Sequence, residues 1–347
     1  MLKKRILQIC PHDVTPFSGL CARYQQAAAQ LGADVTTVFL SPAHSQPLAH
    51  AEYLQCTDLA DTKGLRRALH GYASEPWDLV LCHRYRSYRA VVRTPLAANH
   101  CIVVAHEYGL MDRWQRRLNR SLFAADMTFA GVSTGVAEEL MAGEPVVLPN
   151  VVDVEQARQQ LLSRQDALAV LGLEPGGFTI GVVGRLHYKK RPSLALQAFQ
   201  AFAANHANAR LVFLGEGEER VELEREVASN IHILGNVADA SKLFNAFDAL
   251  LHTTRIEAFG MVVLEALFAG VPVVTLRQGG PAYVLDELGV YASTDSVQGF
   301  ADALHRAQVL DRAELARAGL ARVQQHFSIA ALATALQKLL PGQHPGG

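Results

Sequence analysis

Residues 179–192 read TIGVVGRLHYKKRP, and this stretch carries a pattern that recurs along the chain. Its first six residues are mostly apolar and β-branched, which is typical of a buried strand. A basic loop follows, and Pro192 then suits the first turn of a helix. Because a strand without polar alternation is covered on both faces, the stretch predicts a parallel sheet with helices on each side.

The same alternation of short apolar runs and longer amphipathic runs extends in both directions. We predict strands in the first half at residues 5–10, 34–40, 78–82, 101–105 and 127–132, with helices near 20–30, 65–72, 88–98, 112–123 and 135–141. In the second half we predict strands at 179–184, 210–214, 231–234, 248–252 and 272–276, with helices near 193–204, 218–228, 240–246 and 262–269. This order predicts an α/β protein of two Rossmann-like, doubly wound domains facing a cleft, with ligands at the carboxyl ends of the strands.

The seam between the two domains is expected near residue 150, where Pro149 and Asn150 end a strand. We predict an N-terminal Rossmann-like domain over 1–150 and a C-terminal Rossmann-like domain over 151–327, with one helix at 154–171. Further helices are expected at 296–309, 312–327 and 329–340. The segment 328–347 then holds a C-terminal helix, open to crossing back to the first domain, and a frayed tail.

The composition narrows the class of protein. With 347 residues, 19% charged residues and a formal net charge of −1, the chain is an ordinary globular protein and not a wholly basic nucleic-acid binder. No apolar run approaches the roughly 18 residues that a transmembrane helix needs. The five cysteines have no metal-binding spacing, so we expect reduced thiols, no metal site and a cytoplasmic location.

The segment 255–274, RIEAFGMVVLEALFAGVPVV, has the strongest chemical pattern. Gly260 opens a helix directly after a strand and a polar loop, and the free N–H groups of a helix start bind anions such as a diphosphate. Glu257 and Glu265 are suited to accept the paired hydroxyls of a sugar. The plainer alternative is that Glu257 caps the helix and Glu265 is solvated.

The loop after residue 184 holds four cations within seven residues, Arg185, Lys189, Lys190 and Arg191. Such a loop at the carboxyl end of a strand favours a polyanion, although a solvated basic loop is the alternative. Gly215 and Gly217 suggest a dinucleotide fingerprint, but its third glycine is absent. They more simply allow a tight turn or a close approach of backbone.

Four motifs together resemble a known family. They are Gly184-Arg185-Leu-x3-Lys190, residues 214–217 (LGEG), residues 234–237 (LGNV) and the pair Glu257-x7-Glu265. In this order they are similar to the retaining nucleotide-sugar glycosyltransferases of family 4, of the bacterial cell-surface glycan or lipopolysaccharide type, which have the GT-B fold. The resemblance covers about residues 178–285, with weaker similarity at 102–106, 130–133 and 148–153.

The resemblance implies roles for individual residues. Arg185 and Lys190 match the pair that holds the leaving diphosphate, Glu265 the ribose ligand, and Glu257 the ligand of the donor sugar. His106 matches a histidine near the reacting sugar, for which packing or a backbone hydrogen bond is the alternative. The implied catalytic set is therefore His106, Arg185, Lys190 and Glu257. The implied donor-binding set is Gly19, Gly184, Arg185, Lys190, Gly215, Val237, Glu257, Ala258, Phe259, Gly260, Met261 and Glu265.

The chain departs from the family pattern at several places. Ser18-Gly19 stands where a Gly-Gly pair is common, and Asn150-Val151 replaces the usual Asn-Gly. Arg191 occupies a place where glycine usually follows the lysine, and Tyr283 one often held by glutamate. Because no charged donor-binding group is lost, these departures bear on which sugar fits.

Residues 84–120 are strongly basic, with eight arginines against two acids, a balance of 8 − 2 = +6. This window predicts either a basic helix over 112–123 that lies on an anionic membrane, with Trp114, Leu118, Leu122 and Phe123 as apolar anchors, or pairing with phosphate or carboxylate groups of a glycolipid acceptor. The alternative is a solvated arginine face with Trp114 in the core. The candidate acceptor or membrane residues are Arg84, Arg86, Arg113, Trp114, Arg116, Arg117 and Arg120.

Together these features predict a retaining, hexosyltransferase-like and metal-independent glycosyltransferase without a cofactor. It would move a sugar from a UDP- or GDP-sugar to a hydroxyl of a glycan or glycolipid, and it would bind no nucleic acid. We expect it in the cytoplasm, with a peripheral place on the inner face of the plasma membrane. The alternatives are a nucleotide-sugar epimerase of GT-B fold and a catalytically inactive nucleotide-sugar-binding protein, with an NAD-linked oxidoreductase least favoured.

Overall fold

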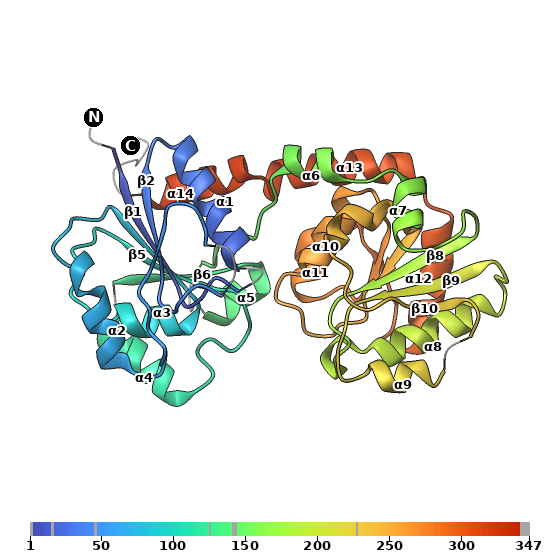
Figure 1. The fold of residues 1–347 in the computed structure, drawn as a ribbon, viewed down its shortest axis with the longest axis horizontal. Coiled ribbons are helices and arrows are strands. Elements are labelled where there is room, and N and C mark those ends of the chain that lie inside the picture. The colour runs from blue at the N-terminus through green and yellow to red at the C-terminus, as the bar shows by residue number, and fades with distance from the viewer. Residues whose placement is uncertain are drawn as a thin grey trace. The chain divides into compact units, whose positions relative to one another are not determined.

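The computed structural model describes residues 3–14, 17–44, 47–124, 126–140, 144–226 and 228–340. The chain divides into two compact units (Figure 1), the first running to Asp153 and resuming at His326, and the second spanning Val154–Gln325. These borders differ slightly from the expected ones at residues 150 and 327. Both units have a parallel sheet with helices on either side, which confirms the predicted fold class.

The first unit holds a seven-stranded parallel sheet in the order β3-β2-β1-β4-β5-β6-β7. Its strands are β1 Arg5–Cys10, β2 Asp34–Phe39, β3 Ala51–Tyr53, β4 Leu79–His83, β5 Cys101–Ala105, β6 Met127–Gly131 and β7 Val146–Val147. The chain runs outward from β1 to β3 and then returns to place β4 on the other side of β1. The switch point of the sheet, where such folds bind ligands, therefore lies between β1 and β4.

Helices cover both faces of this sheet. They are α1 Phe17–Gln30, α2 Thr62–Leu69, η1 His70–Tyr72, α3 Arg84–Val91, α4 Trp114–Phe123, α5 Thr134–Leu140 and α14 Ile329–Leu339. The last of these comes from the far end of the chain and packs on α1, as Figure 1 shows in red and blue. A parallel bridge between Val152 and Ser328 marks the place where the chain returns.

The second unit holds a six-stranded parallel sheet in the order β10-β9-β8-β11-β12-β13. Its strands are β8 Phe178–Val183, β9 Ala209–Leu214, β10 Ile231–Ile233, β11 Ala249–Leu251, β12 Val273–Thr275 and β13 Val290–Tyr291. A buried cluster that includes Phe199, Phe202, Phe213 and Phe300 fills one face of the sheet. The switch point of this sheet lies between β8 and β11.

The helices of the second unit alternate with its strands. They are α6 Val154–Gln160, α7 Arg164–Val170, η2 Tyr188–Lys190, α8 Pro192–Ala203, α9 Arg220–Glu224, η3 Ala240–Ala246, α10 Met261–Phe268, α11 Gly279–Leu285, η4 Asp286–Leu288, α12 Val297–Gln308 and α13 Arg312–His326. Within the described ranges, none of these or the earlier helices combines the length and hydropathy that a bilayer crossing requires.

Several predicted elements were wrong in detail. The single helix expected over 154–171 is two helices, because the N–H of Leu162 donates to the carbonyl of Lys242 and Ser163 caps α7. The helix expected over 88–98 begins earlier, at Arg84, and ends at Val91. The short strands β3 and β13 and the glycine-led helix α11 were missed, because no longer apolar run or helical pattern marks them in the sequence.

Candidate functional site

Polar side chains gather at the switch point of the second sheet. One loop follows β8 and brings Arg185 and Lys190, and the other follows β11 and brings His252 and Thr253. A small cavity of about 20 Å³ lies between them, and Arg185, Lys190, His252, Thr253 and Thr254 contribute to its lining. Residues about sixty positions apart in the sequence thus meet because both loops leave the same edge of the sheet.

Lys190 and Glu257 form a partly buried ion pair in which Lys190 Nζ donates to Glu257 Oε2. His252 Nε2 lies 3.5 Å from the same oxygen, and the Glu257 side chain is only 19% exposed. Burial opposes ionisation of Glu257, but His252 and Lys190 outweigh it and lower the pKa of this carboxyl to about 2. The alternative that Glu257 caps the helix is wrong, because α10 has no side-chain cap.

His252 and Thr253 were not predicted as site residues, although His252 ends a predicted strand and Thr253 directly follows it. Burial lowers the pKa of His252, and its Nδ1 lies 3.2 Å from Thr275 Oγ1. Thr253 Oγ1 donates to the carbonyls of Lys190 and Arg191 at 2.9 and 3.0 Å. Its hydroxyl therefore ties the β8 loop to the β11 loop and fixes the backbone that carries Lys190.

The four cations of the β8 loop have different environments. Lys190 pairs with Glu257, and Arg191 Nη1 donates to Asp295 Oδ1 at 2.6 Å. Arg185 is exposed and has no carboxylate partner within the described part of the chain. Arg185 is therefore the cation of the predicted pair that is open to an incoming anion, whereas Lys190 would share its charge with Glu257.

Arg191 explains one departure from the family pattern. Its backbone is left-handed, with φ 56° and ψ 50°, a conformation that favours glycine. This is the position where the family usually has glycine. In this chain the strained arginine is held by the ion pair with Asp295 and by a 3.4 Å hydrogen bond to the carbonyl of Thr253.

The glycines that follow β8 and β9 allow loop backbones to pack together. A Cβ on Gly215, whose φ is 149°, would lie 2.0 Å from the carbonyl oxygen of Gly184. The N–H of Gly215 in turn donates to the carbonyl of Gly235 at 2.7 Å. These residues shape the edge of the sheet, and Val237 lies half-buried in the loop after β10.

Gly260 opens α10 with φ 87° and lets the chain turn into the helix. The first-turn N–H groups, including that of Met261, have no preceding helical carbonyl and form a partial positive charge. Phe259 is buried, Ala258 is half-buried, and Glu265 lies half-buried in the second turn of α10. The backbone is held in place because the N–H of Gly280 donates to the carbonyl of Glu257 at 2.8 Å.

His106 follows β5 in the first unit and belongs to a network of side chains. Its Nε2 lies 3.0 Å from His83 Nδ1, and His83 Nε2 lies 3.1 Å from Gln8 Nε2. Burial, followed by the positive charge of Arg84, lowers the pKa of His106 to about 3. A neutral imidazole at pH 7 is suited to hydrogen bonding and not to donating a proton as an acid.

Gly19 does not lie in a loop as expected. It is the third residue of α1, and a Cβ there would make only ordinary contact, 3.5 Å from Arg23 Nη1. Neither the backbone nor the packing therefore requires glycine at this position.

The alternative of a solvated arginine face does not hold for Arg116 and Arg120 of α4, which are partly buried. Arg116 Nη1 donates to the carbonyls of Gly109 and Leu110, and its guanidinium lies 4.1 Å from the Tyr85 ring centre. Arg117 donates to the carbonyls of Met111 and Asp112. Arg120 donates to the carbonyl of Leu140 and lies over Phe129. These side chains hold the helix on its own unit.

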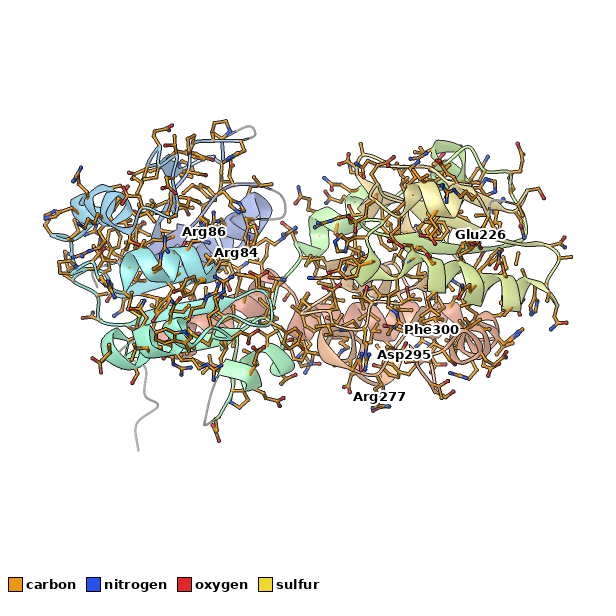
Figure 2. The ribbon with its side chains drawn as sticks, turned by 90° about the horizontal axis from the view of Figure 1, so that it is seen from below. Arg84, Arg86, Glu226, Arg277, Asp295 and Phe300 are labelled. Carbon is orange, nitrogen blue, oxygen red and sulfur yellow. The ribbon has the colours of Figure 1, made fainter. Side chains whose placement is uncertain are left out.

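The outer face of α4 is apolar instead. Trp114, Leu118 and Leu122 follow one another at helical spacing and are 68%, 49% and 62% exposed. The expectation of Trp114 in the core is therefore also wrong. Arg113 lies exposed just before the helix, and Arg84 and Arg86 begin α3 at the carboxyl end of β4 (Figure 2).

Comparisons with known proteins agree with this architecture. Residues 177–308 match the family model described as "Glycosyl transferases group 1". The lipopolysaccharide core biosynthesis mannosyltransferase LpsB of Rhizobium meliloti (strain 1021) is 29% identical over 189 residues, which are 49% of this chain and 53% of LpsB. A GDP-mannose-dependent alpha-mannosyltransferase of Mycobacterium tuberculosis (strain CDC 1551 / Oshkosh) is 31% identical over 170 residues, 48% of this chain and 43% of that protein.

The chain thus spans about half the length of the curated relatives it matches. Among solved structures, Anabaena Alr3699/HepE in complex with UDP aligns over 98% of this chain and 99% of its own, with a TM-score of 0.77 and 16% identity. That likeness concerns the fold, and the residues matched by the family model lie in the second unit. The resemblance seen in the motifs is confirmed at this level: the chain carries a group 1 glycosyltransferase domain within a GT-B fold.

Proposed function

We propose that this protein is a retaining glycosyltransferase that moves a sugar from a nucleoside-diphosphate sugar to an acceptor hydroxyl. The observation that carries the proposal is the group 1 domain with Arg185, Lys190 and the start of α10 at one edge of its sheet. LpsB is named as a lipopolysaccharide core enzyme, which supports a lipopolysaccharide or other cell-surface glycan as the acceptor. With such an acceptor, the enzyme would act at the inner face of the plasma membrane.

In this proposal the donor lies against the β8 loop and α10. Arg185 and the positive end of α10 bind the diphosphate, with Lys190 beside them. Glu265 accepts the ribose hydroxyls. Glu257 and the backbone from Phe259 to Met261 hold the sugar. HepE was solved with UDP and the mycobacterial relative is named for GDP-mannose, so both bases are candidates.

The proposed reaction breaks the bond between the anomeric carbon and the diphosphate oxygen, and the electron pair leaves with the diphosphate. The acceptor oxygen bonds to the same face of that carbon, and its proton passes to the departing phosphate. Arg185, Lys190 and the α10 dipole stabilise the developing negative charge, each worth a few kcal/mol in comparable sites. Neutral His106 would hydrogen-bond the reacting sugar.

The proposal includes no metal ion, because two cations and a helix end meet the charge of the diphosphate. Across the described ranges, no group of three or more His, Cys, Asp and Glu residues could hold one. Turnover unchanged by EDTA is the expected result. Loss of turnover that Mg²⁺ restores would contradict this part of the proposal.

The decisive experiment combines nucleotide binding with turnover. UDP, GDP and their sugars are screened by thermal shift, and a nucleotide at 100 times its Kd should stabilise the fold by about 2.7 kcal/mol. Arg185→Met should weaken this binding, while Arg158→Met, at an exposed arginine of α6 in the same unit, should not. No stabilisation by any nucleotide would refute the proposal.

Turnover separates the alternatives. A transferase releases nucleoside diphosphate faster when an acceptor is present, and the product keeps the anomeric configuration by NMR. An epimerase changes the nucleotide sugar without an acceptor, and an inactive binding protein changes nothing.

A second proposal concerns the membrane. The exposed row of Trp114, Leu118 and Leu122 gives α4 an apolar outer face, and Arg113 adds a cation beside it. An interfacial helix of this kind inserts its apolar residues between lipid headgroups. We therefore propose peripheral binding through insertion of these apolar anchors, with no part for Arg116 and Arg120, which bind within their own unit.

A further inference from the structure

Two adjoining pockets open at the carboxyl edge of the first sheet, at its switch point between β1 and β4. The larger, of about 500 Å³, is lined by the loops after β1, β2 and β3 and by Arg86. The smaller, of about 280 Å³, is lined by residues that follow β1, β4 and β5. His12 and Arg86 line both. A volume of this size suits a small molecule such as a monosaccharide.

The smaller pocket is rich in positive charge. Arg84, Arg86 and Arg116 line it, and Glu107 is the only carboxylate among its lining residues. Arg84 Nη2 donates to Glu107 Oε1 at 3.1 Å, and Arg116 is tied to backbone carbonyls. Arg86 has no carboxylate partner in the described part of the chain, and its side chain is exposed (Figure 2).

His12 lies between the two pockets with an unused hydrogen-bonding atom. Its Nδ1 is buried without a partner, and its Nε2 lies 3.4 Å from Arg84 Nη1. Burial, followed by the positive charges of Arg84, His44 and Arg86, lowers the pKa of His12. Glu107 pairs with Arg84 and Asp13 with His44, so Arg86 is the cation of this group without a carboxylate partner among the described residues.

The backbone around the smaller pocket is also strained. Arg84 has φ 67°, a left-handed conformation that arginine rarely adopts. Such strain is found where surrounding contacts hold a side chain in a required place. On the other side, the buried carboxylate of Asp13 accepts hydrogen bonds from His44 N and Nδ1 at 3.0 and 3.2 Å, which fixes the wall of the larger pocket.

We propose that these pockets bind the acceptor as an anionic sugar, through a phosphate or carboxylate group paired with Arg84 and Arg86. Guanidinium groups pair bidentately with both anions. Nδ1 of His12 is placed to hydrogen-bond the same ligand, and Ser41 and Thr57 of the larger pocket would meet its hydroxyls. The identity of the ligand as the acceptor rests on the proposed glycosyltransferase function, whereas its anionic character rests on the pocket.

Calorimetric binding of glucose, glucose 6-phosphate and glucuronate to the whole protein tests this inference. At least one anionic sugar should bind at least about tenfold more tightly than glucose, the size of one charge-assisted contact. Whichever of the two binds tighter identifies phosphate or carboxylate as the group. Equal affinity for all three sugars would overturn the proposal.

Variants locate the binding. Arg86→Met should remove the preference for the anionic sugar, and Arg86→Lys should keep part of it. Arg66→Met, at an exposed arginine of α2 that does not line the pockets, is the matched control and should leave it unchanged. A preference that survives Arg86→Met but is lost in Arg185→Met would place the anion in the donor site and refute the pocket.

The same samples are titrated with UDP and GDP, so that failure of the glycosyltransferase proposal can be distinguished from failure of the anion-pocket proposal. Nucleotide binding without a preference for anionic sugars refutes the pocket alone. An Arg86-dependent preference without nucleotide binding refutes the glycosyltransferase proposal and leaves the anion pocket standing.

Discussion

At the scale of single residues, two of the four cations in the β8 loop are held in ion pairs, while Arg185 is exposed. Lys190 is bound to Glu257, and Arg191 to Asp295. The ion pairs fix the β8 and β11 loops before any ligand arrives. Preorganisation of this kind lowers the free energy needed to arrange the site during a reaction.

Glu257 should make stability depend on pH. Its pKa is about 2 in the folded protein against an ordinary 4.5, so its ionised form stabilises the fold above pH 4.5. That contribution, on the order of 3 kcal/mol, is lost as the pH falls from 4.5 towards 2. Urea unfolding across this range should show the loss in the native protein. Glu257→Gln has no carboxylate at this position, so its loss of stability should be smaller by about 3 kcal/mol. The same pH profile in both proteins would contradict the low pKa of Glu257.

Arg191 should respond differently to glycine and alanine. Both variants lose the ion pair with Asp295, but only glycine relieves the left-handed backbone at φ 56°. Arg191→Gly should therefore be more stable than Arg191→Ala by about 1 kcal/mol. Urea unfolding midpoints of the two variants measure the difference. Equal midpoints would mean that the backbone is not strained at this residue.

At the scale of elements, helix α4 shows how one sequence pattern can fit two opposite orientations. Arginines and apolar residues alternate along it, and the helix turns Arg116 and Arg120 towards its own unit. Aromatic rings of Tyr85 and Phe129 and unpaired backbone carbonyls attract the guanidinium groups. The apolar row is left outside as a consequence.

The orientation of α4 makes a clear prediction for membrane binding. Leu118→Glu should reduce binding to phosphatidylglycerol vesicles by about tenfold or more, because a charge replaces an inserted apolar side chain. Val309→Glu, at an apolar residue of the other unit that is 81% exposed, is the matched control and should bind as the native protein does. Vesicle sedimentation measures both. The membrane proposal would be refuted if the native protein did not bind the vesicles at low salt.

At the scale of the whole molecule, the first unit is built from both ends of the chain. Helix α14 packs on α1, and the carbonyl of Phe327 accepts from the N–H of Val152. The first unit therefore completes its fold only when the last described helix is in place. The second unit lies between the two segments in the sequence and is continuous.

Tryptophan fluorescence can test this arrangement. Both tryptophans, Trp77 and Trp114, belong to the first unit, so their emission reports its unfolding. Leu336→Ala in α14 removes a fully buried side chain and should destabilise the first unit by about 2–5 kcal/mol. Leu304→Ala, equally buried in the second unit, should shift the fluorescence midpoint less. Equal shifts would show that the two units unfold together.

By itself the sequence determined the α/β class, most strands and the glycosyltransferase motifs, because alternating apolar runs and loops that follow strands are local patterns. The strands β3 and β13 and the helix α11 were not predicted, because no longer apolar run or helical pattern marks them. Tertiary structure alone decided the partners: Lys190 with Glu257, Arg191 with Asp295, the inward arginines of α4, and α14 on α1. It also brought His12 to Arg84 and Arg86. These contacts join residues far apart in the chain, and only the packing of the sheets and helices brings them together.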